Sequence, residues 1–250
     1  MIGQAFLDGF EILREPRFLD VAESVCRWIL ALPRERTESG TCLSYHALEQ
    51  HRVHNANMLG AAFLARTWHH SRDAEYLDVA ASAIQYTCTR QRPDGSWWYG
   101  EETKYQWIDN FHTGYILDSL KCYIDSTGDL TFKPGLDAGF QYFTTHFFET
   151  SGRPKYYHNR AQPIDIQCAA QAIETLAKFA DRTNDALETA LRVAQWTIEH
   201  MQDPTGYFYY RRYPLLAARI PMLHWGQATM FAALAQLLLR LDTQRRGRRY

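Results

Sequence analysis

The chain contains 250 residues, of which 46% are hydrophobic and 22% are charged, so it can bury one large core. The formal net charge of −1 gives no electrostatic reason to expect nucleic acid or an anionic membrane as a partner. No apolar run approaches the roughly 20 residues that would span a bilayer, and the N-terminus lacks the pattern of a signal peptide. The five cysteines are scattered and form no CxxC pair, which favours reduced thiols in a cytoplasmic protein.

In chain order, the sequence predicts helices of two alternating kinds. A first helix is expected over residues 2–13, and amphipathic outer helices follow over residues 17–32, 74–90, 136–150 and 185–201. Inner helices, richer in small and apolar residues, are expected over residues 54–68, 108–123, 164–179 and 224–241. Small residues such as Ala61 and Ala169 let helices approach closely, so the inner helices should be the more buried set.

A repeat is visible in the loops that join each outer helix to the next inner helix. Four segments each place a glycine shortly before a group of aromatic residues: ESGTCLSYH, PDGSWWYG, TSGRPKYYHNR and PTGYFYYRR. Their glycines are Gly40, Gly95, Gly152 and Gly206, so the intervals are 55, 57 and 54 residues. The repeating unit is therefore an outer helix, a glycine turn with an aromatic extended segment, and an inner helix.

Helical pairs of this length stack either as an open solenoid or as a closed ring. The long aromatic loops before the inner helices favour a ring, in which these loops gather around one mouth. We therefore expect an all-α fold, an α/α toroid of about four to five helical hairpins with a repeat near 55 residues. A single domain is expected over residues 1–241, followed by a basic flexible tail over residues 242–250.

A ring would bring the polar residues at the starts of the inner helices together around one funnel. These residues are His54, Asn55, Asn57, Asp109, Asn110, His112, Asp165, Gln167, His224 and Gln227. Aromatic residues would form the rim: Trp97, Trp98, Tyr99, Tyr105, Trp107, Tyr156, Tyr157 and Tyr209. An apolar wall with a few convergent polar groups is typical of a small-molecule site. Asn and Asp at helix starts also cap helices, and that role alone would explain Asp109 and Asp165.

Asp109 and His112 are the strongest candidates for acid–base chemistry. They lie three residues apart, hence on one face of a helix, where a carboxylate can tune an imidazole. Asp165 and His224 form the second pair of candidate catalytic residues. Flat aromatic faces together with carboxylate, amide and guanidinium groups suit sugar rings, and Arg side chains suit a uronate or phosphate. The expected substrate-binding set is completed by His158, Arg160, Arg211 and Trp225.

The segments DGSWWYG, WIDNFHTGYILDSL, PIDIQCAAQAI and HWGQATMFAALAQLL resemble the α/α-toroid proteins, which include terpenoid cyclases, prenyltransferase β-subunits and six-hairpin glycan-active enzymes. More narrowly, they resemble bacterial and archaeal toroid proteins associated with polysaccharide biosynthesis. The resemblance covers residues 10–241 and implies a toroid fold. The DxDD motif of class II terpene cyclases is absent. Asp165, Cys168 and His224 resemble the zinc ligands of prenyltransferases in layout but not in spacing, so zinc is an alternative to having no cofactor.

These observations predict a carbohydrate-active protein of polysaccharide metabolism or biosynthesis that binds a glycan or lipid-linked saccharide. A lyase, epimerase or hydrolase would use Asp109, His112, Asp165 and Tyr157. Two alternatives remain open at the level of sequence. One is a non-catalytic glycan-binding or scaffold subunit of a polysaccharide-synthesis complex, since GxSxG and HExxH motifs are absent. The other is an isoprenoid-handling toroid. A homodimer or a complex with polysaccharide-synthesis proteins is the expected assembly.

Overall fold

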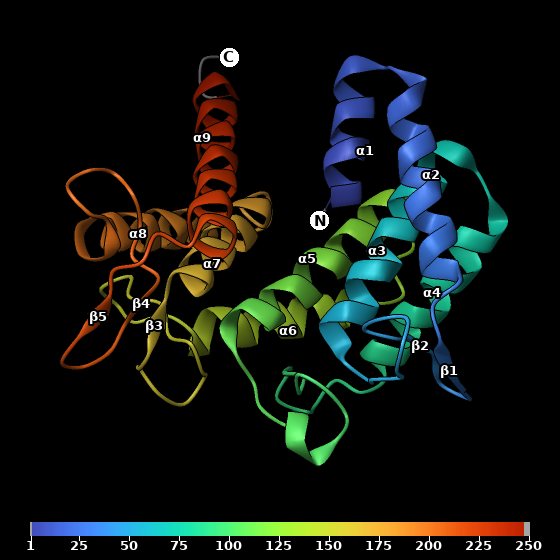
Figure 1. The fold of residues 1–250 in the computed structure, drawn as a ribbon, viewed down its shortest axis with the longest axis horizontal. Coiled ribbons are helices and arrows are strands. Elements are labelled where there is room, and N and C mark those ends of the chain that lie inside the picture. The colour runs from blue at the N-terminus through green and yellow to red at the C-terminus, as the bar shows by residue number, and fades with distance from the viewer. Residues whose placement is uncertain (1, 248–250) are drawn as a thin grey trace. The chain divides into compact units, whose positions relative to one another are not determined.

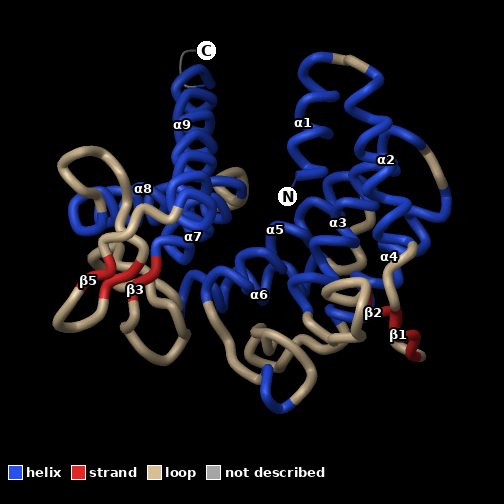
Figure 2. Tube along the Cα trace, viewed as in Figure 1, coloured by secondary structure: helices blue, strands red, loops and turns tan. Residues whose placement is uncertain are grey.

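The computed structural model describes residues 2–247, and Met1 and residues 248–250 lie outside the described residues. The described chain is mostly helical, with a few very short strands (Figure 1, Figure 2). It divides into two compact units, the first made of Met1–Trp107 and Tyr115–Phe140 and the second of Ile108–Gly114 and Gln141–Tyr250. No helix in the described residues is both long and apolar enough to cross a membrane.

The first unit is built from helical hairpins joined by short extended segments. Its elements are α1 (Ile2–Leu13), α2 (Pro16–Leu30), β1 (Arg34–Thr37), β2 (Gly40–Leu43), α3 (His54–Ser71), α4 (Ala74–Cys88) and η1 (Thr103–Tyr105). Helix α1 packs against α2, and α3 packs against α4. Pro16 begins α2, where its missing N–H and fixed φ cost nothing. Asp73 caps α4, because its carboxylate accepts the backbone N–H of Glu75 at 3.0 Å.

Two helices, α5 (Asn110–Thr127) and α6 (Lys133–His146), have residues in both units. The other elements of the second unit are β3 (Ile164–Asp165), α7 (Ile166–Lys178), α8 (Asn184–Met201), β4 (Arg211–Arg212), β5 (Ala217–Ala218), the π-helix η2 (Leu223–Ala228) and α9 (Thr229–Gly247). Helix α7 packs against both α8 and α9 and is the most buried helix of this unit. Ala169, Ala170 and Ala172 are at most 1% exposed, as expected for an inner helix that its neighbours approach closely.

The four repeated glycines all adopt positive φ, a conformation that side chains with a Cβ rarely take. These glycines are Gly40, Gly95, Gly152 and Gly206, with φ of 116°, 90°, 88° and 103°. At the first three, an added Cβ would lie 2.3–2.5 Å from a backbone carbonyl oxygen, that of Ser82 in α4, Ala138 in α6 and Arg192 in α8, respectively. Each of these turns therefore packs against the outer helix of the next hairpin. At Gly206, no heavy atom of the described chain lies within 4 Å of the added Cβ.

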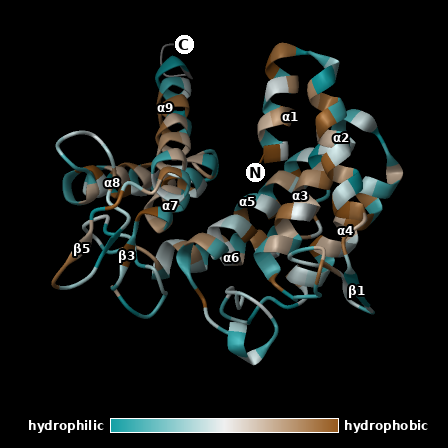
Figure 3. Ribbon diagram, in the orientation of Figure 1, coloured by the Kyte–Doolittle hydropathy of each residue, from teal (hydrophilic) through white to brown (hydrophobic). Residues whose placement is uncertain are grey.

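The predicted alternation of outer and more buried inner helices is seen for α3, α5 and α7. Helix α9, expected as an inner helix, differs, because it buries Met230, Ala233 and Leu237 but exposes Phe231, Leu238 and Leu239. Figure 3 shows hydrophobic and hydrophilic residues on the same helices, as amphipathic packing requires. The C-terminal boundary differs from the expectation, because α9 continues past Leu241 to Gly247. The expected flexibility of the tail stays a prediction, and its last three residues lie outside the described chain. The expectation of one domain over residues 1–241 also stays a prediction.

Candidate functional site

Asp109 stands immediately before α5 and holds His112 in two ways. Its Oδ1 atom accepts the backbone N–H of His112 at 3.0 Å, which caps the helix. Its Oδ2 atom lies 2.7 Å from Nδ1 of the same histidine. Asp109 is 1% exposed, whereas 18% of the His112 side chain is exposed. The carboxylate therefore serves as the expected cap and, at the same time, orients an accessible imidazole.

The segment around Tyr157 fixes the start of α5 from the side. Asp109 and Tyr157 form an antiparallel bridge, and the backbone N–H of Asn110 donates to the carbonyl oxygen of Tyr156 at 2.9 Å. The Nδ1 atom of His158 lies 3.3 Å from the carbonyl oxygen of Ile108. The aromatic segment of the third repeat is therefore in direct contact with the Asp109–His112 pair.

Asn110 is fully buried, yet its amide has no partner. Neither Oδ1 nor Nδ2 makes a hydrogen bond within the described residues. Most buried polar groups in folded proteins are paired, so an unpaired amide calls for a specific explanation such as a bound water or ligand. Its position next to Asp109 makes it a candidate for contact with substrate.

Asp165 repeats the arrangement of Asp109 at the start of α7. Its Oδ1 atom accepts the backbone N–H of Gln167 at 2.8 Å, and its Oδ2 atom accepts Nε and Nη2 of Arg211 at 2.7 and 2.6 Å. The pairing of β3 with β4 places Asp165 opposite Arg211. Burial raises the pKa of Asp165, which is 3% exposed, while the Gln167 N–H and the Arg211 guanidinium oppose that rise.

These two carboxylates share one electrostatic environment. Burial raises the pKa of Tyr156, and the charges of Asp109 and Asp165 raise it further. The charge of Asp109 also contributes to the raised pKa of Asp165. The guanidinium of Arg211 lies 5.5 Å from the ring centroid of Tyr156. Asp109, its neighbours Asn110 and His112, and the nearby Tyr156, Asp165 and Arg211 form a group that is called the Asp109 cluster.

Other predicted residues of the second unit have different surroundings. His224 and Trp225 lie in η2, are exposed, and stack on each other with ring centroids 4.4 Å apart. The side-chain amide of Gln227 bonds both the N–H and the carbonyl oxygen of Phe208, each at 2.8 Å, so it fixes a loop. Exposed Arg160 lies 4.1 Å from the ring centroid of Tyr157.

Two predicted residues of this unit have structural contacts of their own. The hydroxyl of Tyr209 donates to Asp203 at 3.2 Å. Gln167 is half-buried, and its backbone N–H donates to Oδ1 of Asp165, the residue that caps α7. A role in binding substrate stays a prediction for these residues and for Trp225, Gln227 and Arg160, as does a catalytic role for His224.

In the first unit, His54 is a buried histidine in contact with a carboxylate. It is 1% exposed, its Nε2 lies 2.7 Å from Oε1 of Glu101, and its Nδ1 lies 3.3 Å from the hydroxyl of Thr87. Asn57 is a structural clamp, because it accepts the N–H of Leu43 and donates to the carbonyl oxygen of Ala83 and the hydroxyl of Thr87. Both side chains are engaged within the unit.

The remaining predicted residues of the first unit divide into core and loop residues. Trp97 is 1% exposed and donates from Nε1 to the carbonyl oxygen of Thr87 at 3.0 Å, so it belongs to the core. Tyr99 and Trp107 stack with ring centroids 4.6 Å apart, and Tyr105 meets both edge-on. In the loops, Trp98 lies under the guanidinium of Arg92. Buried Asn55 has an Oδ1 atom without a partner in the described chain.

The alternative zinc ligands are not arranged as a metal site. Burial raises the pKa of Cys168 well above its ordinary value, which disfavours the thiolate that binds zinc. Asp165 is engaged by Arg211, and His224 is exposed. Within residues 2–247, the group with metal-like spacing is instead His46, Glu49 and His51, whose donor atoms lie within 4.8 Å of one another. His46 already accepts two backbone N–H groups through Nδ1, at 3.2 Å each, and His51 bonds Glu49.

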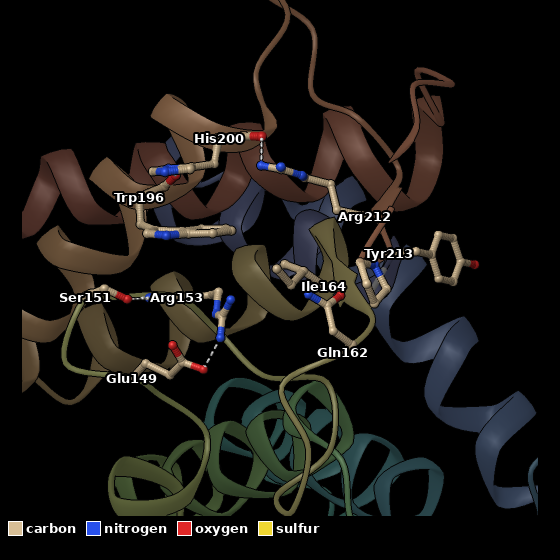
Figure 4. A pocket seen from close by; sticks show the side chains of 10 residues that line it. Glu149, Ser151, Arg153, Gln162, Ile164, Trp196, His200, Arg212 and Tyr213 are labelled. Atoms are coloured by element: carbon tan, nitrogen blue, oxygen red, sulfur yellow. Dashed lines mark hydrogen bonds and ion pairs between the residues drawn. The ribbon is translucent and has the colours of Figure 1, made fainter. Parts of the chain in front are cut away.

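A polar pocket of about 370 Å³ is a further feature of the second unit (Figure 4). It is lined by residues of the loop before β3, of α8, and of β4 and the segment after it. Three lining residues, Ser151, Arg153 and Arg212, lie in segments that the repeat marks. The sequence pattern does not reveal this pocket, because its residues come from three segments that are far apart in the chain.

No known family model and no curated protein sequence matches the chain. Several solved structures match it in fold. A sugar epimerase from a ruminal bacterium has a TM-score of 0.78 and 10% identity, over 94% of this chain and 68% of the other. A cellobiose 2-epimerase from Bacillus thermoamylovorans has a TM-score of 0.71 and 10% identity, over 96% and 70%. An α-mannanase from Bacteroides thetaiotaomicron has a TM-score of 0.73 and 10% identity, over 98% and 68%. The chain therefore has the α/α-toroid fold that these sugar-acting proteins share.

Proposed function

We propose that the protein is a carbohydrate-active enzyme that moves a proton on a bound sugar, as an epimerase or isomerase does, at the Asp109 cluster. The observation that carries this proposal is the contact of 2.7 Å between the buried Asp109 carboxylate and Nδ1 of partly exposed His112. A carboxylate in this position holds the imidazole in one orientation, so that its other nitrogen, Nε2, exchanges a proton with substrate.

Epimerisation and isomerisation of a sugar both begin at the carbon next to a carbonyl group. In the proposed step, His112 takes the proton from this carbon at Nε2, and the electron pair moves onto the carbonyl oxygen. The negative charge that develops there requires a positive partner, for which the Arg211 guanidinium, held by two bonds to Asp165, is suited. In epimerisation, the proton returns to the opposite face of the same carbon and the carbonyl group re-forms. In isomerisation, the enediolate oxygen takes the proton that the neighbouring hydroxyl loses, a proton adds to the former carbonyl carbon, and the neighbouring oxygen becomes the carbonyl. Neither route consumes an oxidant or reductant.

Recognition of the sugar would use the unpaired groups of the cluster. The buried amide of Asn110 offers one acceptor and two donors that no described residue uses, which suits sugar hydroxyls. The rings of Tyr156 and Tyr157 lie 4.6 Å apart and offer apolar faces for the C–H side of a sugar ring.

The fold comparisons support a sugar as the substrate without identifying the reaction. Two of the similar structures are a sugar epimerase and a cellobiose 2-epimerase, and a third is an α-mannanase, each at 10% identity. Likeness at this level concerns the fold, so the proposal of proton transfer depends on the Asp109 cluster itself.

The test is exchange of the sugar C–H for solvent deuterium. Mannose and cellobiose are incubated with the protein in D₂O, and label at C2 and the appearance of the epimer or isomer are followed by NMR. We expect exchange with the wild type and a loss of about 1,000-fold or more with Asp109→Asn or His112→Gln, since an unoriented or absent base cannot act. His69→Asn, a change at an exposed histidine of the first unit, is the matched control. Wild-type rates in both site variants would refute the proposal.

A glycoside hydrolase is the second candidate, because such enzymes use a pair of carboxylates, and Asp109 and Asp165 are two buried carboxylates whose charges interact. Release of reducing ends from α-mannan, lost in Asp165→Asn, would support this activity. Saturable glycan binding without product in either assay would favour the non-catalytic binding subunit. A lipid-linked substrate, a homodimer or synthesis complex and a cytoplasmic location remain proposals from the sequence. The isoprenoid alternative also remains a proposal from the sequence.

A further inference from the structure

The polar pocket lies on the opposite face of the small sheet from the Asp165–Arg211 pair. In the pairing of β3 with β4, Ile164 is opposite Arg212 and Asp165 is opposite Arg211. Successive side chains of a strand point to opposite faces. Ile164 and Arg212 line the pocket, whereas Asp165 and Arg211 bond each other on the other face. The pocket is therefore separate from the Asp109 cluster.

The pocket contains more positive than negative charge. Arg153 forms an ion pair with Glu149, and both side chains are about one-third exposed. Arg212 donates from Nη1 to the carbonyl oxygen of His200 at 2.9 Å, but it has no carboxylate partner in residues 2–247. A guanidinium without a counter-ion in a cavity presents several N–H groups in a geometry that matches a carboxylate or phosphate.

Two buried polar atoms of the lining residues also make no hydrogen bond to any part of the chain that the structure describes. They are Nε of Arg153, which is a donor, and Oε1 of Gln162, which is an acceptor. Unpaired buried groups are uncommon, and a donor and an acceptor in the wall of one polar cavity indicate a molecule that has both acceptors and hydroxyl groups. An inorganic anion without a hydroxyl group, such as sulfate, would supply acceptors but would leave the Gln162 oxygen unpaired.

An aromatic side chain forms another wall of the pocket. The indole of Trp196 stacks on the imidazole of His200, with ring centroids 4.5 Å apart and planes 3° apart. Figure 4 shows the indole of Trp196 between this imidazole and Arg153. Such a flat apolar surface beside charged groups suits a ring that has a C–H face and polar substituents.

We propose that this pocket binds an anionic saccharide unit, a sugar that carries a carboxylate or a phosphate group, as a second ligand site. The anionic group pairs with Arg212, the free N–H of Arg153 donates to a ring substituent, and a hydroxyl of the sugar donates to Gln162. The site does not depend on the proposed proton transfer, because none of these residues belongs to the Asp109 cluster.

The proposal is tested by isothermal titration of the full chain with D-glucuronate, glucose 6-phosphate and D-glucose. We expect saturable binding of at least one of the two anions, and glucose bound at least about tenfold more weakly, since loss of a charge-assisted hydrogen bond has this size of effect. The two anionic probes distinguish a carboxylate ligand from a phosphate ligand. Asp109→Asn should leave the affinity unchanged, so that failure of the proposed reaction and failure of this site are separable.

Substitutions locate the binding. Arg212→Gln removes the charge but keeps a donor for the His200 carbonyl, and it should weaken binding of the anion about tenfold or more. Gln162→Leu should weaken binding as well, and circular dichroism of each variant confirms its fold. Arg219→Gln, which removes an arginine outside the pocket on the following loop, should change the affinity by less than about twofold. The proposal is overturned if the wild type binds neither anion, if glucose binds equally well, or if Arg212→Gln and Arg219→Gln bind alike.

Discussion

The glycine repeat makes a quantitative prediction for two substitutions in the same unit. Gly152 and Gly206 both have positive φ, 88° and 103°, so alanine at either site forces an unfavourable backbone conformation at a cost of about 1–2 kcal/mol. Alanine also reduces the conformational entropy of the unfolded chain at both sites, which offsets about 0.4–1 kcal/mol of that backbone cost. The sites differ in space: the new Cβ meets the Arg192 carbonyl oxygen at 2.4 Å in the first case and nothing within 4 Å of the described chain in the second.

Because the backbone terms are shared, the difference between the two variants isolates the steric overlap. Overpacking of a well-packed contact costs about 1–3 kcal/mol, so Gly152→Ala should be less stable than Gly206→Ala by that amount. Urea unfolding followed by circular dichroism measures both free energies of unfolding, with equal m-values as the check that the denatured states are comparable. Equal destabilisation by the two substitutions would refute the view that the turn at Gly152 packs tightly on α8.

Three further predictions concern single polar side chains. Asn57→Ala should destabilise the chain by about 2–4 kcal/mol in urea unfolding, because it removes three buried hydrogen bonds. Asn110→Leu should cost less than about 1 kcal/mol of stability and weaken sugar binding. Equal losses of stability in the two variants would contradict this. Bonding to His54 lowers the pKa of Glu101, so its stabilisation is complete above the ordinary value of 4.5 and is lost as pH falls through the lower folded value. Glu101→Gln should therefore flatten the dependence of melting temperature on pH below 4.5, and an unchanged slope would exclude the contribution. Asp109→Asn should retain the melting temperature better than Asp109→Ala, since asparagine still caps the helix; equal losses in thermal melts would argue against the cap.

The repeat could be predicted from the sequence because its physical cause is local. A glycine that must adopt positive φ cannot be replaced cheaply, so Gly40, Gly95 and Gly152 recur at the same point of each hairpin. The amphipathic period then predicts which helix faces the core. The short pairing of β3 with β4 has no such local signal, since it depends on two segments about 45 residues apart that meet only in the folded chain.

The candidate site was predictable only in part. The spacing of Asp109 and His112 on one helix face is a local property, and the structure places their side chains in contact. The partner of Asp165 is Arg211, which is distant in sequence, so the ion pair could be anticipated only as residue types in neighbouring loops. Asn55 has the position in its repeat that Asn110 has in the next, and its Oδ1 likewise makes no hydrogen bond within the described residues. Asn57, two residues further on, instead clamps the loop of β2. Residue type alone does not distinguish a clamp from a free amide, because the difference lies in the surrounding backbone.

Capping and chemistry are therefore not competing explanations for the two buried aspartates. In each, one carboxylate oxygen accepts a backbone N–H at the start of an inner helix, and the other binds a basic side chain, His112 for Asp109 and Arg211 for Asp165. The cap fixes the direction of the carboxylate at little cost, because the helix start needs an acceptor in any case. The second oxygen is thereby aimed at its partner without further support. The two inner helices that begin with an aspartate, α5 and α7, can thus place a base and a cation by the same local geometry that starts the helix.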